Sequence, residues 1–171
     1  MQGFVQVYTG DGKGKTTAAL GLALRAAGAG FRVYIGQLIK NADYSELRAL
    51  HRLADLITVE QYGRGCMLVM QPEQADIDAA RAGLAALKAV LRSGAFDVVI
   101  ADEINVACAL GLLDEQDLLD LLADRPETVE LVLTGRGAPT SVLARADLVT
   151  EMRSIKHYYD QGVPTRKGIE V

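Results

Sequence analysis

Eight consecutive residues, Gly10 to Thr17, combine three glycines, two lysines, two threonines and an aspartate. Glycine lets the chain turn tightly, and successive backbone amides in such a loop can surround phosphate oxygens. In the P-loop pattern Lys15 would reach the phosphates, and the hydroxyl of Thr16 would bind Mg²⁺. The segment therefore predicts a nucleotide phosphate site.

The segment fits one glycine-rich nucleotide-binding pattern better than another. A full G-x-x-x-x-G-K-[ST] pattern needs glycine where Thr9 stands, so Gly10 is expected to make the turn. The dinucleotide pattern G-x-G-x-x-G fails because its last glycine would fall on Lys15, which excludes NAD binding. An incidental glycine turn is the alternative, and the expected strand before the loop and helix after it disfavour it.

Two acids follow the apolar run Val98–Ala101, namely Asp102 and Glu103. Ligands of parallel sheets lie beyond the carboxyl ends of the strands, where a carboxylate can face Thr16. Mg²⁺ prefers oxygen ligands and keeps several waters, so a hydroxyl, one carboxylate and phosphate oxygens would complete a site. The metal candidates are Thr16, Glu103 and Asp102; alternatively, the acids cap a helix over 104–110.

Other polar residues carry weaker signals. Arg136 follows another apolar run and is either a phosphate or propionamide contact or a surface arginine. His51 and His157 stand alone, as surface or structural histidines usually do. The two cysteines, Cys66 and Cys108, lack the spacing of a zinc site and are expected to be small apolar residues.

The candidate site residues must be positioned by the secondary structure, and the sequence predicts strands that alternate with helices. Short β-branched or continuous apolar runs predict strands over 4–8, 32–38, 57–61, 97–102, 129–134 and 148–152. Helical spacing and end signals predict helices over 15–27, 46–53, from Pro72 as a first helical residue to Gly94, 114–123 with Asp114 as cap, and 139–146. About six strands alternating with helices predict an α/β fold with a mostly parallel sheet.

Length and charge narrow the class. At 171 residues the chain is expected to form a single domain, 1–171, with a polar tail over 153–171 that is either a lid or a disordered end. A net charge of −4 argues against a nucleic-acid-binding face. Interrupted apolar stretches and an N-terminus without signal-peptide features predict no membrane span and a cytoplasmic location.

The ensemble resembles the P-loop type of ATP:corrinoid adenosyltransferase across nearly the whole chain. The resemblance rests on the order and spacing of Thr9-Gly10-Asp11-Gly12-Lys13-Gly14-Lys15-Thr16-Thr17-Ala18-Ala19, Gln37-Leu38-Ile39-Lys40, Asp102-Glu103-Ile104, Thr134-Gly135-Arg136-Gly137, Lys156-His157-Tyr158-Tyr159-Asp160-Gln161-Gly162-Val163 and Lys167-Gly168-Ile169-Glu170.

The resemblance implies a RecA-like P-loop fold, a homodimer, and a loop that holds ATP with its ribose C5′ accessible. Reduced corrinoid, Co(I), would attack C5′ and release triphosphate, with an electron donor such as a flavoprotein or reduced flavin. Lys15 and Arg136 are the candidate catalytic residues. The candidate ATP-binding residues are Thr9, Gly10, Asp11, Gly12, Lys13, Gly14, Lys15, Thr16 and Thr17.

The sequence departs from better-known members at two places. It begins almost at the first strand, so closure by an N-terminal extension is not expected. Cys66, Met67 and Leu68 stand where longer relatives carry aromatics against the corrin, and they form either an apolar wall or ordinary core.

Two rival functions share the loop. A small-molecule kinase or ATPase would use the acid pair near the terminal phosphate. A non-catalytic nucleotide switch would recruit a partner instead. A guanine-reading N-K-x-D element is absent, which disfavours a GTP switch.

Overall fold

In the computed structural model, which describes residues 2–65 and 72–170, apolar strands alternate with helices. The elements are, in chain order, β1 (Val5–Thr9), α1 (Lys15–Gly28), β2 (Val33–Gln37), α2 (Ser45–Leu50), the 3₁₀ helix η1 (His51–Leu53), β3 (Ile57–Gln61), α3 (Gln74–Arg92), β4 (Val98–Asp102), α4 (Ile104–Ala109), α5 (Glu115–Ala123), β5 (Glu130–Thr134), α6 (Thr140–Arg145), β6 (Leu148–Glu151) and the 3₁₀ helix η2 (Tyr158–Gln161).

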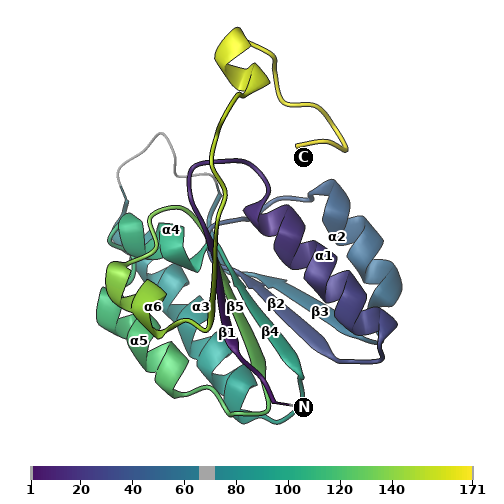
Figure 1. Ribbon diagram of the computed structural model, residues 1–171, viewed down its shortest axis with the longest axis vertical. Helices are drawn as coiled ribbons and strands as arrows, with labels where there is room; N and C mark the ends of the chain where they lie inside the picture. Colours follow the sequence, from purple (N-terminus) through teal and green to yellow (C-terminus); the bar gives the residue numbers. More distant parts are fainter. Residues whose placement is uncertain (1, 66–71, 171) are drawn as a thin grey trace.

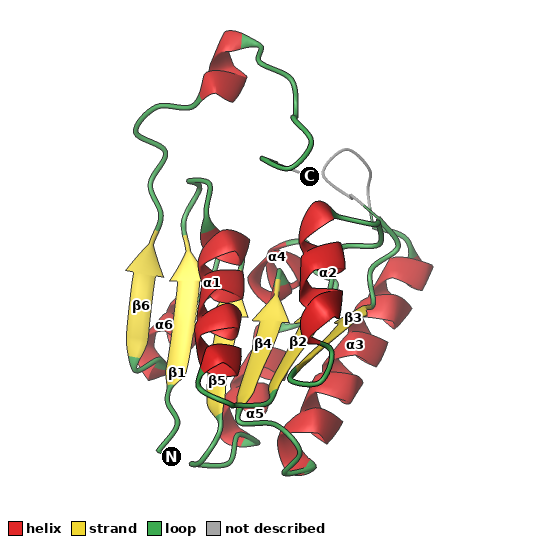
Figure 2. Cartoon of the chain, turned by 90° about the vertical axis from the view of Figure 1, so that its right-hand side faces the viewer, coloured by secondary structure: helices red, strands yellow, loops and turns green. Residues whose placement is uncertain are grey.

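The strands form one six-stranded sheet in the order β3-β2-β4-β5-β1-β6, and every neighbouring pair is parallel (Figure 2). Parallel pairing places the carboxyl ends of all strands at one edge, which the loop after β1 shares. The expected α/β fold with a mostly parallel sheet of about six strands is confirmed.

Helices cover both faces of the sheet. Helices α1 and α2 lie on one face, and α3, α4, α5 and α6 lie on the other (Figure 1). Side chains of β2 alternate accordingly: Ile35 belongs to the apolar cluster that includes α1 residues, while Tyr34 belongs to the cluster that includes α3 residues. Burial on both faces explains why the central strands read as continuous apolar runs.

Most predicted element ends hold within a few residues, but the start of α3 was predicted wrongly. Pro72 lies outside this helix, which begins at Gln74 with Glu73 as N-cap. Glu73 and Asp76 form a capping box, in which the amide of Glu73 donates to Asp76 Oδ2 at 2.8 Å. Reciprocal capping satisfies two helix-end donors and decides the start of the helix. The predicted cap Asp114 is confirmed, with the same device involving Asp117.

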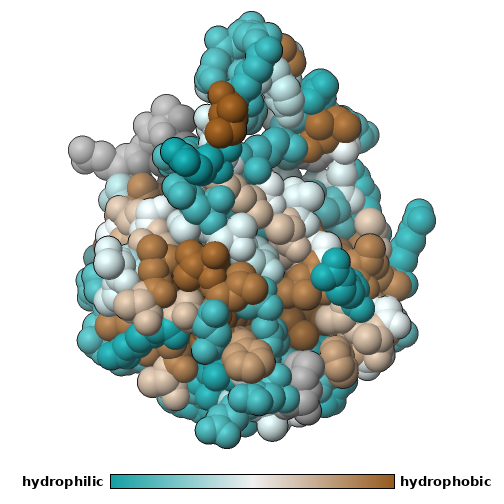
Figure 3. Space-filling model, viewed as in Figure 1, coloured by the Kyte–Doolittle hydropathy of each residue, from teal (hydrophilic) through white to brown (hydrophobic). Residues whose placement is uncertain are grey.

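The tail after β6 leaves the body of the molecule beyond the carboxyl ends of the strands and turns back (Figures 1 and 2). It contains η2 and a contact of the Arg166 guanidinium with the Tyr158 ring, 4.7 Å from its centroid. The tail surface is mainly hydrophilic, above a body that carries apolar patches (Figure 3). Among the described residues, no helix is long and apolar enough to span a membrane.

Candidate nucleotide-binding site

The glycine loop connects β1 to α1 as the sequence predicts. Gly10 and Gly14 have φ angles of 94° and 122°, a region that side chains rarely adopt. A Cβ on Gly10 would also lie 2.4 Å from the carbonyl oxygen of Met152. Glycine is therefore required at the turn, and Gly10 makes the turn without a glycine at Thr9.

Lys15, the first residue of α1, turns back into the loop and is only 8% exposed. Its Nζ donates to the carbonyl oxygens of Gly10 and Gly12 at 2.6 and 2.7 Å. Burial lowers the pKa of Lys15, the nearby charge of Arg136 lowers it further, and Glu103 and Asp11 oppose this. An ammonium held inside a glycine loop is placed to meet an anion that the loop binds.

Asp102 lies at the end of β4, fully buried, and accepts hydrogen bonds from four side chains. Thr16 Oγ1 and Thr134 Oγ1 donate to Oδ1 at 2.8 and 2.7 Å. Gln37 Nε2 and Lys40 Nζ donate to Oδ2, each at 3.0 Å. Both carboxylate oxygens are therefore occupied, and a direct bond from Asp102 to a metal would replace one of these hydrogen bonds.

Glu103 differs from Asp102 in its backbone conformation and in its lack of side-chain partners. Its φ of 63° makes it the one described non-glycine residue in the left-handed region, a strain that is often found at functional sites. Its side chain makes no hydrogen bond or ion pair with the described residues. Burial raises the pKa of Glu103, the adjacent charge of Asp102 adds to this, and Lys40, Lys15 and Arg136 oppose it.

The alternative view, in which the acids cap the next helix, is wrong. Glu103 is the N-cap residue of α4, but no side-chain capping bond is formed there. The backbone amide of Glu103 instead donates to Thr134 Oγ1 at 2.9 Å. The carboxylate of Glu103 therefore remains available at the carboxyl edge of the sheet.

Arg136 follows β5 in a loop that packs closely on α4. A Cβ on Gly135, whose φ is 127°, would lie 2.9 Å from the backbone nitrogen of Val106. The Arg136 side chain is exposed and makes no hydrogen bond or ion pair within the described part of the chain. Its charge nevertheless acts on the pKa values of Lys15 and Glu103, so it lies near both.

The remaining predicted residues lie around this group. Asp11, Lys13 and Thr17 are exposed, and Lys13 Nζ donates to the tail carbonyl of Ile169 at 3.1 Å. Thr9 Oγ1 accepts from the amide of Ala138 at 3.4 Å. The structure therefore brings Lys15, Thr16, Asp102, Glu103 and Arg136 together and leaves Asp11, Lys13 and Thr17 on the outside of the loop.

Single histidines and cysteines lie apart from this group. His157 caps η2, where its Nδ1 accepts from the amide of Tyr159 at 3.0 Å, which agrees with a structural histidine. Burial raises the pKa of the Cys108 thiol, as expected for a small apolar residue. Cys66, Met67 and Leu68, expected to form either an apolar wall or ordinary core, lie outside the described residues.

Sequence reasoning did not assign roles to Lys40 and Gln37. Lys40 Nζ lies 3.0 Å from Asp102 Oδ2 and 3.4 Å from Thr16 Oγ1. Burial lowers the pKa of Lys40, but the charge and hydrogen bond of Asp102 outweigh burial and raise it. The available signal was their position at the end of the second strand, beside the glycine loop.

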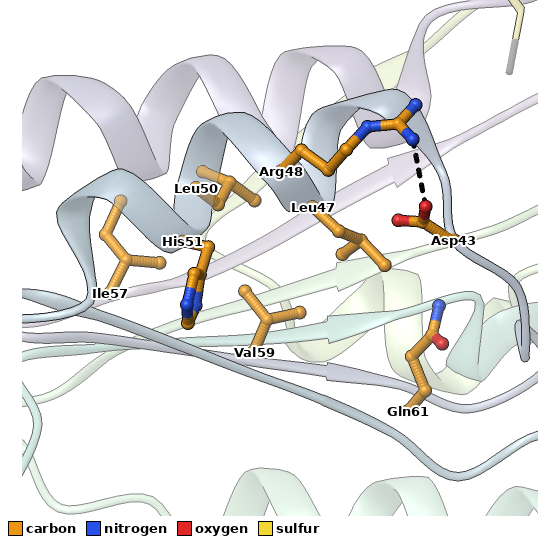
Figure 4. A pocket seen from close by; sticks show the side chains of 8 residues that line it. All are labelled: Asp43, Leu47, Arg48, Leu50, His51, Ile57, Val59 and Gln61. Carbon is orange, nitrogen blue, oxygen red and sulfur yellow. Dashed lines mark hydrogen bonds and ion pairs between the residues drawn. The ribbon is translucent and has the colours of Figure 1, made fainter.

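A hollow of about 500 Å³ lies beside this site, between α2 and the edge strand β3 (Figure 4). Arg48 and Asp43 form an ion pair of 2.9 Å at its rim. Apolar and polar side chains share its wall, which is lined by Asp43, Leu47, Arg48, Leu50, His51, Ile57, Val59 and Gln61. Gln61 connects this wall to the site, because its Nε2 donates to Gln37 Oε1 at 2.9 Å.

Comparisons with known proteins find relatives that match nearly the whole chain. The corrinoid adenosyltransferases of Pseudomonas aeruginosa and Escherichia coli K12 are each 34% identical to the chain, cover 99% of it, and are themselves covered to 84% and 86%. The corrinoid adenosyltransferase CobA of Salmonella typhimurium is also 34% identical, with coverages of 99% and 86%.

A solved structure supports the fold. The KaiC-like protein PH0186 of Pyrococcus horikoshii OT3 has a TM-score of 0.59 and 14% identity, covering 91% of this chain and 74% of that protein. This likeness confirms the RecA-like P-loop fold and nothing further. A family model described as "ATP:corrinoid adenosyltransferase BtuR/CobO/CobP" matches residues 1–171. The chain therefore belongs to the ATP:corrinoid adenosyltransferase family, whose members transfer the adenosyl group of ATP to a corrinoid.

Proposed function

We propose that this adenosyltransferase holds the triphosphate of ATP in the loop Gly10–Thr17 and directs the ribose C5′ to a reduced corrinoid. The observation that carries the proposal is the concentration of positive charge at this loop. Lys15 Nζ lies inside it, Lys40 Nζ lies 3.4 Å from Thr16 Oγ1, and Arg136 is near enough to affect Lys15. Such a cluster stabilises a polyphosphate on which negative charge grows.

The reaction makes one bond and breaks one. The electron pair of Co(I) attacks C5′, a cobalt–carbon bond forms, and the C5′–oxygen bond breaks with its pair passing to the triphosphate. Lys15 and the loop amides would stabilise that leaving group, and Arg136 would supply further charge. The nucleophile belongs to the substrate, so the protein's task is alignment and charge stabilisation.

The donor set fits a magnesium ion. Thr16 Oγ1 donates its hydroxyl hydrogen bond to Asp102 and accepts a long one of 3.4 Å from Lys40 Nζ, which leaves an oxygen lone pair for a metal, and the Glu103 carboxylate has no partner among the described residues. Thr16 and Glu103 would therefore hold Mg²⁺ directly, while Asp102 would act on it through Thr16. Mg²⁺ bound there would neutralise charge on the triphosphate.

Several further parts of the proposal depend on the family relationship. The chain is expected to act as a homodimer in the cytoplasm and to receive corrinoid reduced by a flavoprotein or reduced flavin. Residues 1–171 would form one domain. Its tail, 153–171, would act as a lid, because the described part lies beyond the carboxyl ends of the strands (Figure 2) and Lys13 contacts Ile169. Light scattering measures the oligomeric state directly.

Anaerobic incubation with ATP, Mg²⁺ and chemically reduced corrinoid tests the reaction. We expect the visible spectrum of a light-sensitive alkyl-cobalt species to grow, with one inorganic triphosphate released for each product. Orthophosphate and ADP would instead indicate a kinase or ATPase. Binding of a partner that depends on ATP, without any adenosyl product, would indicate a nucleotide switch. Omitting Mg²⁺ tests the proposed metal.

A further inference from the structure

Three polar residues lie in one row across the carboxyl edge of the sheet. Gln37 on β2 is in register with Gln61 on β3 and with Asp102 on β4. Residues in register on neighbouring strands project from the same face of a sheet. Here this is the face that carries α1, because Asp102 bonds to Thr16 of that helix.

Hydrogen bonds connect the row in one direction. Gln61 Nε2 donates to Gln37 Oε1 at 2.9 Å, and Gln37 Nε2 donates to Asp102 Oδ2 at 3.0 Å. An ionised carboxylate can only accept, so Gln37 must present its NH₂ group to Asp102 and its oxygen to Gln61. Gln61 must then present its own NH₂, whose second hydrogen bond goes to the carbonyl of Ala42 at 3.2 Å.

We propose that Gln37 is a positioning residue for magnesium-bound ATP, acting through Asp102 on the hydroxyl of Thr16, and that Gln61 holds Gln37 in place. This rests on the proposed role of Thr16 as a metal ligand. Gln37 and Lys40 together occupy Asp102 Oδ2, which leaves Oδ1 directed at Thr16 and Thr134. Without the amide, Oδ2 would keep only the ammonium, and the carboxylate would be free to turn toward Lys40.

The Gln37 amide is buried, unlike polar groups on the surface of the protein. Gln37 is fully buried, and a buried polar side chain is retained at a cost unless each of its groups is bonded. Both ends of its amide have partners that lead to the glycine loop on one side and to the segment containing Ala42 on the other. Partners of metal ligands typically contribute tenfold to hundredfold in affinity.

Gln37→Met tests the proposal, because methionine keeps the length and shape of the side chain but removes both hydrogen-bonding ends. We expect Gln37→Met to weaken binding of ATP about tenfold when Mg²⁺ is present, and to change binding of ATP in EDTA less than twofold, because the loop amides are unaltered. The KM for ATP should rise while the KM for the corrinoid stays unchanged. Calorimetric titration measures both affinities.

Tyr34→Phe is the matched control. Tyr34 lies on the same strand, is buried, and bonds through its hydroxyl to Glu60 and Tyr62 on the opposite face. Tyr34→Phe should lower the unfolding temperature without changing the magnesium dependence of ATP binding. If Gln37→Met does not fold, Gln61→Met carries the test, since it removes the bonds from Gln61 to Gln37 and to the Ala42 carbonyl but leaves Gln37 bonded to Asp102, and it should weaken magnesium-dependent binding to a smaller extent.

Thr16→Ala separates the two proposals. If it weakens magnesium-dependent binding while Gln37→Met does not, the positioning role is overturned and the metal site stands. If Thr16→Ala has no effect, both proposals fall. Equal loss of ATP binding with and without Mg²⁺ in Gln37→Met would indicate a purely structural role and would also overturn the inference.

Discussion

The carbonyl oxygen of Met152 accepts a hydrogen bond of 2.7 Å from the amide of Gly12. The chain just after β6 is thereby fastened to the glycine loop, although the two residues are far apart in sequence. Met152 also pairs with β1 through its own amide, which donates to Thr9 at 2.8 Å. The geometry of the loop therefore depends on the last strand as well as on α1.

Gly12→Ala should disturb this contact. A Cβ at Gly12 would lie 2.8 Å from backbone atoms of both Met152 and Arg153, so the chain just after β6 or the loop must move. We expect the free energy of unfolding to fall by about 1–3 kcal/mol, the usual cost of overpacking, and ATP binding to weaken. Urea denaturation and calorimetry measure the two effects.

Gly21→Ala is the control for Gly12→Ala. A Cβ at Gly21, within α1, meets nothing within 4 Å. Alanine is the better helix former by about 0.5–1 kcal/mol, so this variant should be more stable and should bind ATP normally. Unaltered stability and ATP binding in Gly12→Ala would contradict the described packing of the loop.

Lys15→Ala should slow adenosylation by about 10²–10³-fold, or roughly 3–4 kcal/mol of transition-state stabilisation, because it removes the ammonium inside the loop. Arg136→Ala should cost less, since its side chain is exposed. Lys88→Ala, on α3 and thus on the face of the sheet opposite α1 (Figure 1), should react at the wild-type rate. Rates measured at saturating corrinoid give these values, and a wild-type rate in Lys15→Ala would remove Lys15 from the proposed mechanism.

The fold follows closely from the pattern of apolar runs. The strand Ile57–Gln61 was predicted to the residue, because a β-branched run is bounded by clear breaks. The start of α3 was missed because Pro72 and the Glu73/Asp76 pair both signal helix starts, and the capping box that the pair forms places the start at Gln74. Local signals of similar strength therefore limit the precision of element ends.

The candidate site was predictable in part. One carboxylate of the pair Asp102 and Glu103 was expected to face Thr16 at the carboxyl ends of parallel strands, and Asp102 does so, with its Oδ1 2.8 Å from Thr16 Oγ1. Gln37 and Lys40 belong to a segment that carries the resemblance, but the sequence assigns them no role, and their hydrogen bonds to Asp102 appear only where the end of β2 and the residues after it lie beside β4. The left-handed conformation of Glu103, which separates it from Asp102, also has no signature in the residue type.

The ion-pair cluster in the tail predicts a pH effect. Hydrogen bonds from Arg166 and then from Tyr158 lower the pKa of Glu170 to about 2. Because the pKa of Glu170 is lower in the folded protein, its ionised carboxylate stabilises the cluster fully when the pH is above the unfolded-state pKa of about 4.3. This stabilisation is lost as the pH falls through the folded-state pKa of about 2. We expect an NMR titration of Glu170 to show this low midpoint.

Variants of the tail distinguish an ordered segment from a disordered end. Arg166→Ala should move the midpoint of Glu170 toward the ordinary value, because the largest cause of the shift is gone. Tyr159→Phe alters a side chain that is 74% exposed and should leave the midpoint in place. An ordinary midpoint in the wild-type protein would mean that the cluster does not form in solution.

Glu103→Gln should separate metal binding from folding. Glutamine keeps the shape of the side chain and removes the charge, so magnesium-dependent ATP binding should weaken about 10–100-fold. The free energy of unfolding should rise by about 1 kcal/mol, because a partly buried carboxylate without a described partner is replaced by a neutral group. Glu127→Gln, at an exposed site, should change neither quantity. If Glu103→Gln were less stable yet bound ATP with Mg²⁺ normally, the strained conformation of Glu103 would serve the fold and not the metal. A metal ligand behaves in the opposite way, because loss of its charge weakens magnesium-dependent binding and at the same time removes the cost of burying an unpaired carboxylate.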